Sequence, residues 1–214
     1  MVLAIGLGRI FGFRFPENFR WPYVADTIQE FWRRWHISLS SCLRDYLYIP
    51  FGGNRGGEWK TRRNLMLTML IGGLWHGASW NFVIWGGYHG ALLILYRVFG
   101  RTWDAIPAPL RQAGMFILVL VGWVFFRATN LPMAVSLLSR MIVPTTGELV
   151  PNAAAFAAFA ALGLWLGMAG PNAFDLHRQD QVSWRRAYAL SAAFGICIAM
   201  MAGNAASPFL YFQF

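Results

Sequence analysis

Long apolar segments dominate this sequence and most limit what the chain can fold into. Four of them are close to the length of about 20 residues that an α-helix needs to cross the hydrocarbon core of a membrane. Only 13% of the 214 residues are charged, against about 25% in a soluble domain. We therefore expect an all-α fold, a polytopic transmembrane helical bundle that forms one membrane domain over residues 1–214. The predicted membrane segments are 64–98, 112–127, 153–170 and 188–203.

The basic residues are mostly arginines placed between the apolar segments. The net charge is +9, and Lys60 is the only lysine among 18 basic residues. Arginines interleaved with membrane segments favour anchoring at an anionic membrane surface, so we expect the lipid bilayer and no nucleic acid as a partner. The connections 97–111 and 170–186 carry more arginines than 127–152. This bias predicts that they face the cytoplasm and that the C-terminus lies outside.

The two cysteines give no sign of a disulfide framework or a zinc site. Cys42 and Cys197 are far apart, and neither belongs to a C-x-x-C motif. We expect no metal site and no bound cofactor.

An amphipathic helix is predicted before the membrane segments, over residues 26–49. Thr27 and Glu30 have the spacing of a capping box, which marks the start of a helix. Arginines lie off the apolar stripe, and Pro50 ends the pattern. We interpret the segment as a basic helix at the membrane interface or under the bundle. The stripe recurs at intervals of three and four residues, at Ile28, Trp32, Trp35, Leu39, Leu43 and Tyr46.

His76 is the first candidate for chemistry. It follows the short apolar run Asn64–Trp75, and Gly72, Gly73 and Gly77 surround it. If the arginines before this run mark the interface, a helical rise of about 18 Å places His76 past the middle of the membrane core. Irregular backbone at that depth lines a protein-walled or watery cavity, and a titratable residue there indicates a functional site. The alternative is a histidine that only bridges helices through hydrogen bonds.

A buried histidine suits acyl transfer. Burial disfavours the charged ring, and a neutral imidazole can take the proton of a hydroxyl that attacks an ester or thioester carbonyl. No G-x-S-x-G motif is present, so direct transfer with a histidine base is simpler than an acyl-enzyme. His36, on the apolar stripe, is the second candidate, although an interfacial helix also tolerates its ring as a packing group. We expect His89 to pack between helices or line a pore, and His177 to be solvated.

The loop Phe51–Gly57 (FGGNRGG) and its neighbouring basic residues form a positive patch. Its arginines and Lys60 can hold the phosphates of a donor, and lipid headgroups would bind the same groups. The loop lacks the G-K-[ST] ending of a P-loop, which weakens the case for a nucleotide site.

Several ordered motifs resemble the membrane-bound O-acyltransferase (MBOAT) superfamily. The resemblance is closest to the alginate O-acetyltransferase branch and extends to the membrane protein of the teichoic acid D-alanylation system. It covers about residues 1–100, with weaker agreement at Val121–Ala128 and Pro208–Phe214. Ala4–Gly8 resembles the middle of a family helix, so we expect the C-terminal half of a longer bundle. The motifs are Phe31–Ser40 (FWRRWHISLS), Leu43–Pro50 (LRDYLYIP), Gly52–Arg55 (GGNR), Gly72–Gly77 (GGLWHG) and Trp85–Gly90 (WGGYHG).

The resemblance implies roles for particular residues. His76 matches the essential histidine of the family and His36 its second characteristic polar position, so both are predicted to be catalytic. The family fold implies a helical funnel crossed by a tunnel, in which the donor arrives from the cytoplasm and the acceptor from outside. We assign donor or substrate binding to Arg33, Arg34, Trp35, Arg44, Asp45, Asn54, Arg55, Trp75, Asn81 and His89.

The expected function is O-acetylation of an exported polysaccharide such as alginate. Acetyl-CoA is the expected acyl donor, and the acceptor is the polysaccharide itself or one of the periplasmic polysaccharide-acetylation proteins that work with such enzymes. The chain is expected in the bacterial inner membrane as a multi-pass protein. Two alternatives stay open: transfer of D-alanyl or another acyl group to a teichoic acid-like polymer, and a non-catalytic membrane scaffold or transporter fragment.

Overall fold

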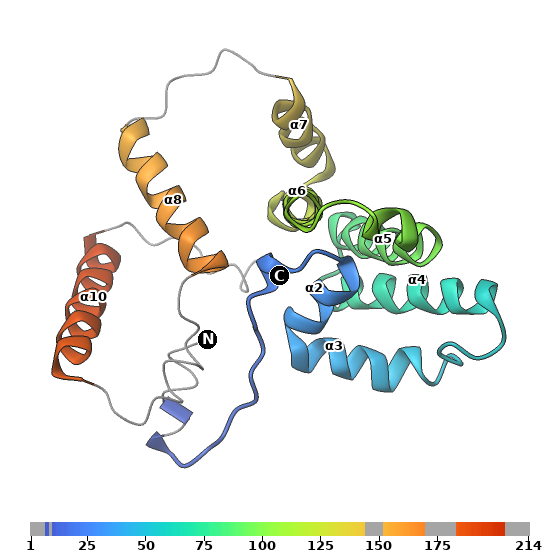
Figure 1. Ribbon diagram of the computed structural model, residues 1–214, viewed down its shortest axis with the longest axis horizontal. Helices are drawn as coiled ribbons and strands as arrows, with labels where there is room; N and C mark the ends of the chain where they lie inside the picture. Colours follow the sequence, from blue (N-terminus) through green and yellow to red (C-terminus); the bar gives the residue numbers. More distant parts are fainter. Residues whose placement is uncertain (1–6, 9, 144–151, 170–182, 204–214) are drawn as a thin grey trace. The chain divides into compact units, whose positions relative to one another are not determined.

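The structure is a computed structural model that describes residues 7–8, 10–143, 152–169 and 183–203 (Figure 1). Every regular element within these residues is helical, which confirms the predicted all-α fold. The chain separates into two compact units, residues 1–170 and 171–214. The second unit contributes one described helix, α10 (Trp184–Gly203). The other described helices belong to the first unit.

Helix α2 (Ile28–Arg34) begins where the capping box predicts. A 3-10 turn, η1 (Pro22–Val24), leads into it. The Thr27 hydroxyl accepts a hydrogen bond from the backbone N–H of Glu30 at 3.2 Å, which satisfies one of the N–H groups left free at a helix start. The sequence therefore identified this end of the segment correctly.

The segment predicted as one helix over residues 26–49 is broken after α2. A second helix, α3 (Ile37–Leu43), continues into a π-helical turn, η2 (Arg44–Tyr48). Between α2 and α3, His36 has left-handed backbone angles, with φ 43° and ψ 56°. The prediction of a continuous helix is therefore wrong. Apolar periodicity reports which side chains share a face, and one left-handed residue changes that pattern too little to be seen.

Three long helices follow, α4 (Glu58–Trp75), α5 (Trp80–Asp104) and α6 (Ala108–Arg127), and α5 runs antiparallel to α4. Arg97, late in α5, pairs with Glu58 at the start of α4, with two contacts of 2.8 Å. By length and composition, α5 and α6 are long and apolar enough to cross a membrane. Two shorter helices complete the unit, α7 (Leu131–Ile142) and α8 (Ala153–Met168).

Glycines bring α4 and α5 into backbone contact. A Cβ atom added to Gly73 would lie 2.2 Å from the backbone oxygen of Phe82, and one added to Gly86 would lie 2.3 Å from that of Met69. No side chain fits at either position. Small residues that allow this approach are typical of helix pairs in membranes. The pair α4–α5 is therefore a rigid support for the residues at its ends.

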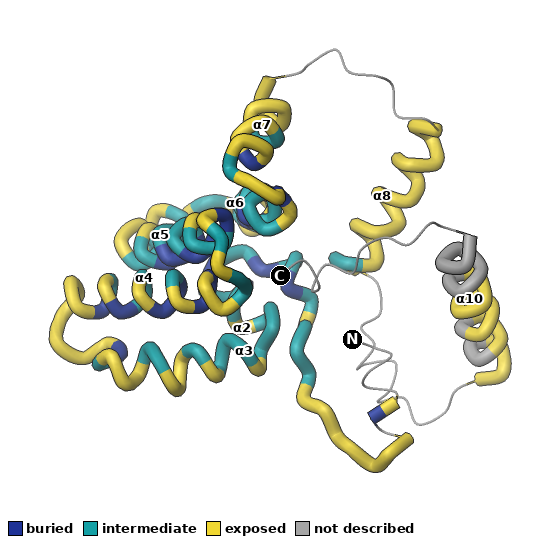
Figure 2. Tube along the Cα trace, turned by 180° about the vertical axis from the view of Figure 1, so that it is seen from behind, coloured by how far each residue is buried: buried dark blue, intermediate teal, exposed yellow. Residues whose placement is uncertain are grey.

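The core of the first unit lies between α2, α4, α5 and α6. Figure 2 shows buried residues along α4, which lies between α3 and α5, and exposed residues along nearly all of α8. The apolar stripe of α2 contributes to this core, so protein covers it. An exposed apolar surface such as that of α8 indicates contact with lipid or with other protein. The core residues are Ala25, Ile28, Phe31, Met69, Leu93, Met115 and Val119.

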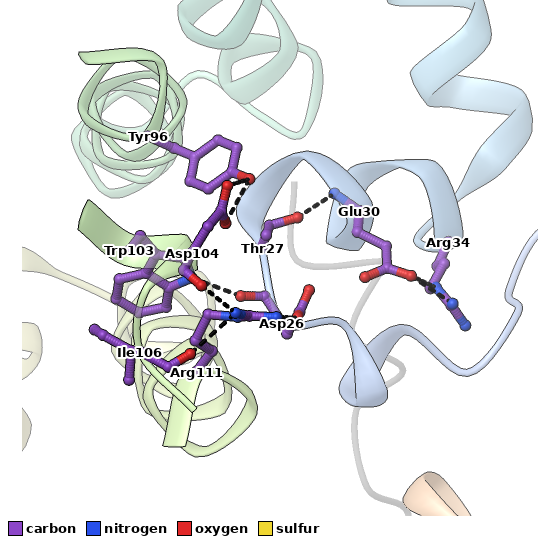
Figure 3. A network of polar contacts seen from close by, with 9 residues as sticks. All are labelled: Asp26, Thr27, Glu30, Arg34, Tyr96, Trp103, Asp104, Ile106 and Arg111. Carbon is purple, nitrogen blue, oxygen red and sulfur yellow. Dashed lines mark hydrogen bonds and ion pairs between the residues drawn. The ribbon is translucent and has the colours of Figure 1, made fainter. Parts of the chain in front are cut away.

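A polar network joins the start of α2 to the turn between α5 and α6 (Figure 3). The Asp26 carboxylate accepts hydrogen bonds from Nε and Nη2 of Arg111 at 3.0 and 2.5 Å, and the Asp26 backbone oxygen accepts one from Trp103 at 2.7 Å. Arg111 also donates to the backbone carbonyls of Asp104 and Ile106. The network holds the first turn of α2 against α5 and α6.

Replacing Arg111 with alanine is expected to lower the Tm of the protein by several degrees. The Asp26 side chain is only 26% exposed, so it would lose its charged partner without full access to water. Thermal unfolding in detergent, followed by tryptophan fluorescence, measures the change. Arg101→Ala is the matched control, because it removes an exposed arginine from the last turn of α5, near the turn that the network holds. Equal Tm values for the two variants would show that the network contributes nothing.

Candidate active site

His76 lies where the end of α4, the start of α5 and the end of α6 meet. Its ring is half-buried and packs against four aromatic rings. The centroid distances are 4.9 Å to Trp75, 5.2 Å to Trp85, 5.0 Å to Phe126 and 6.1 Å to Phe82. Its environment is therefore built by all three long helices.

The glycines around His76 have different roles from one another. Gly72 and Gly73 are buried inside α4, which continues to Trp75. The helix stops at His76 because Gly77, with φ 151°, turns the chain in a way that residues with a side chain rarely adopt. The expected break in the helix is confirmed after His76 and not before it.

Trp75 brings the two predicted catalytic histidines to one place. Its ring centroid lies 6.5 Å from that of His36 and 4.9 Å from that of His76, and both rings are nearly perpendicular to it. The histidines are 40 residues apart in the sequence. Both therefore contact the same indole, although His36 lies between α2 and α3 and His76 follows α4.

His36 is held in a half-buried position between α2 and α3. Its Nδ1 atom is buried and has no hydrogen-bond partner among the described residues. Burial lowers the pKa of His36 below its ordinary value, against a smaller opposing effect of a backbone hydrogen bond. At neutral pH its ring is thus neutral and can accept a hydrogen bond or a proton.

A third histidine extends the same cluster of rings. His89 is 2% exposed and lies 4.9 Å from Trp85 and 5.2 Å from Trp32. On α6, a Cβ atom at Gly122 would come within 2.7 Å of His89 Nε2, so only glycine allows this approach. The expected packing of His89 between helices is confirmed, and its assignment to donor binding stays a prediction. We call His36, Trp75, His76, Trp85, His89 and Phe126 the ring cluster.

Several residues assigned to donor binding have other contacts. Arg34 forms an ion pair with Glu30 one turn earlier on α2, and Arg33 is exposed on the same helix. Trp35 packs edge-on against Trp123 of α6 at 5.0 Å. Asn81 is 3% exposed and donates to the backbone carbonyl of Ala128 at 2.6 Å. Asn81 thereby joins the start of α5 to the end of α6, which supports the wall of the ring cluster.

The remaining assigned residues lie around η2 and the loop that follows it. Arg44 and Asp45 pair with each other, and the Asn54 side chain accepts a hydrogen bond from Tyr48. Arg55 is exposed on the loop. The structure does not bring these residues to the ring cluster. The loop lies beside Asn64 in the first half of α4, whereas His76 follows the other end of that helix. Arg44 lies farther along α4, beside Thr68 and Met69.

An apolar hollow of about 170 Å³ lies between these polar residues and the ring cluster. Arg44 and Tyr48 line one part of it and Trp32 another, and Trp32 contacts Trp85 and His89. The Nε1 atom of Trp32 is buried and has no hydrogen-bond partner in the described part of the chain. The hollow is therefore apolar, and it reaches the ring cluster only through Trp32. Its lining comprises Trp32, Ser40, Leu43, Arg44, Tyr48, Leu65, Thr68, Met69 and Leu93.

Sequence reasoning missed Trp85, Phe126 and Asn18. Trp85 lies four residues before His89 and so on the same side of a helix, a signal that the sequence contained. Phe126 reaches His76 only because α6 folds back along α5, which no local pattern reports. Asn18 contacts the break at His36 from a distant segment.

The histidines do not form a metal centre with other ligands. Among the described residues, no three His, Cys, Asp or Glu side chains are close enough to hold a metal ion. Cys42 is exposed as a free thiol, whereas the side chain of Cys197 and all of His177 lie outside the described residues.

Comparison with known proteins identifies the family of the chain. Residues 2–136 match the membrane-bound O-acyltransferase family. This range contains the whole ring cluster, and it is most of the chain. The chain belongs to this family. The MBOAT match includes Val121–Ala128, whereas Pro208–Phe214 lies beyond it.

Three relatives of this MBOAT chain are named for three different acyl-transfer reactions. It is 60% identical over 135 residues to a probable alginate O-acetylase of Azotobacter vinelandii, which covers 62% of this chain. It is 47% identical over 144 residues to a peptidoglycan O-acetyltransferase of Helicobacter pylori, covering 65% of the chain. It is 36% identical over 112 residues to a teichoic acid D-alanyltransferase of Bacillus subtilis, covering 47%. In each case the match spans 27% of the relative's length.

Proposed function

We propose that the protein transfers an acetyl group from a cytoplasmic donor towards the hydroxyls of an exported polysaccharide, with His76 as general base. One observation carries the proposal. His36 and His76, the two histidines to which the resemblance assigns roles, contact the same indole ring at the junction of α4, α5 and α6. The membrane-bound family and its acetyltransferase relatives support acyl transfer as the reaction.

In the proposed reaction a neutral nitrogen of His76 takes the proton of an acceptor hydroxyl. The hydroxyl oxygen attacks the thioester carbonyl carbon, a C–O bond forms, and the C–S bond breaks. The leaving thiolate then takes the proton from the imidazolium, which restores the neutral histidine. The products are an ester and a free thiol, so no further reactant is needed.

Acetyl-CoA is the proposed donor. Its phosphates would meet the basic residues of η2, of the loop after it and of the first turn of α4, among them Arg44, Arg55 and Lys60. Its long thiol-bearing arm would enter the apolar hollow beside Trp32, whose free N–H can donate to an amide of that arm. The arrangement of a polar entrance and an apolar hollow next to the ring cluster supports this direction of entry.

The proposed acceptor is an exported polysaccharide such as alginate, reached directly or through a periplasmic acetylation protein. The 60% identity to a probable alginate O-acetylase supports this choice. The proposed location is the bacterial inner membrane, which the protein crosses several times. The relative named as a teichoic acid D-alanyltransferase keeps D-alanyl transfer as the second candidate.

A transfer assay separates the two candidates. Membranes that contain the intact protein are supplied with radiolabelled acetyl-CoA or with a D-alanyl thioester donor, and label in the exported polymer is counted. We expect label from acetyl-CoA only, and only where the exported polysaccharide is made. Label from the D-alanyl donor alone would establish the second candidate. Absence of transfer from both donors, with the protein present at normal levels, would favour a scaffold.

A further inference from the structure

The position of His36 is unusual for a residue at the start of a helix. It is the N-cap of α3, yet its side chain makes no capping hydrogen bond, and its φ of 43° is left-handed. Left-handed angles are unfavourable for a non-glycine residue, because its Cβ comes too close to the following carbonyl oxygen. Such a residue persists only where the surrounding structure holds it in place.

Asn18 supplies the cap that His36 does not. The backbone N–H of Ile37 donates to the backbone oxygen of Asn18 at 2.9 Å, and the N–H of Ser38 donates to its side-chain oxygen at 2.8 Å. These are two of the N–H groups that a helix start leaves free. They are satisfied by a residue about 20 positions earlier in the chain.

The residues next to Asn18 hold the other side of the break. The backbone N–H of Arg20 donates to the carbonyl of Arg34 at 2.9 Å, at the end of α2. The Phe19 ring packs 4.7 Å from Trp35 and 5.8 Å from His36. The segment from Asn18 to Arg20 therefore contacts both helices and the histidine between them.

The other described caps of this kind are local. Thr27, Ser79 and Asn130 each lie at the N-cap position of the helix that they cap. In these three helices the capping side chain therefore belongs to the N-cap residue itself. At α3 that position is free for a histidine because a distant asparagine does the capping.

We propose that Asn18 is a positioning residue: by capping α3 from outside, it allows a histidine at the N-cap and holds the His36 ring against Trp75. The expected effect of Asn18 on acyl transfer rests on the function proposed for His36 and His76. The expected effect of Asn18 on the position of the His36 ring is independent of that function.

The test compares Asn18→Ala and Asn18→Asp in the intact protein. Alanine removes the side-chain acceptor, whereas aspartate keeps an oxygen in that place and adds a charge that a helix start favours. Asn130→Ala is the matched control, since it removes an asparagine cap from α7 without touching the ring cluster. Diethyl pyrocarbonate, which modifies neutral imidazoles, is applied to membranes, and modification of His36 and His76 is followed by peptide mass spectrometry. Acetyl transfer is measured on the same membranes.

In Asn18→Ala we expect several-fold faster modification of His36, an unchanged rate at His76, and several-fold slower transfer. Asn18→Asp and Asn130→Ala should match the wild type in all three measurements. Unchanged modification of His36 in Asn18→Ala would overturn the proposal, and so would equal acceleration in Asn18→Asp. Faster modification with unchanged transfer would uphold the role of Asn18 and contradict the role of His36 in the reaction.

Discussion

Replacing His76 with glutamine is expected to lower acyl transfer by about 10²–10⁴-fold, the usual contribution of a general base. The amide keeps hydrogen-bonding capacity and roughly the shape that Trp75, Trp85 and Phe126 enclose, but it cannot take a proton. His76→Ala should therefore be no worse than His76→Gln. The measurement is the initial rate of acetyl transfer in membranes with matched levels of each variant, because lost folding imitates lost chemistry.

Two further histidine variants sharpen this result. His36→Gln should keep part of the activity and mainly weaken use of the donor, since His36 contacts Trp75 from the side of α2 and α3. His177→Gln should transfer at the wild-type rate. Near wild-type turnover by His76→Gln would show that His76 is not the general base. His76 would then be a packing residue of the α4–α5–α6 junction.

Replacing Gly86 with alanine is expected to prevent normal packing of α4 on α5. The added methyl group would lie 2.3 Å from the backbone oxygen of Met69, and neither atom belongs to a side chain that can rotate away. Overpacking of this kind costs typically about 1–3 kcal/mol, and a clash with backbone belongs at the upper end. We expect a strongly reduced yield of folded protein and a lower Tm in detergent.

Gly87→Ala is the matched control for this prediction. Gly87 is the next residue on the same helix, and a Cβ there would lie 3.5 Å from the Leu70 side chain, an ordinary contact. Helix propensity improves equally in both variants, since each exchanges glycine for alanine inside α5. Only the contact differs between them. If Gly86→Ala were as stable as Gly87→Ala, the close approach of α4 and α5 would not hold.

The local part of this architecture can be predicted from the sequence. Long apolar segments with few charges are sufficient for an all-α membrane protein, because a chain in lipid must satisfy its backbone groups within helices. The capping box at Thr27 and the glycine turn after His76 are local as well, and both were found. The motif order around His36 and His76 also indicated the family that residues 2–136 match.

Tertiary structure alone decided how the candidate site is assembled. The apolar stripe predicted one helix over residues 26–49, whereas the chain breaks at His36, where Asn18 caps α3 from outside. The contacts of His76 with Phe126 and of Trp75 with His36 join residues that are 50 and 39 positions apart in the sequence. Helix periodicity follows from bonds between residues three and four apart, so it carries no information about such pairs. Which helices meet is determined by close packing, here by glycines that let α4 and α5 touch, and packing involves the whole unit at once.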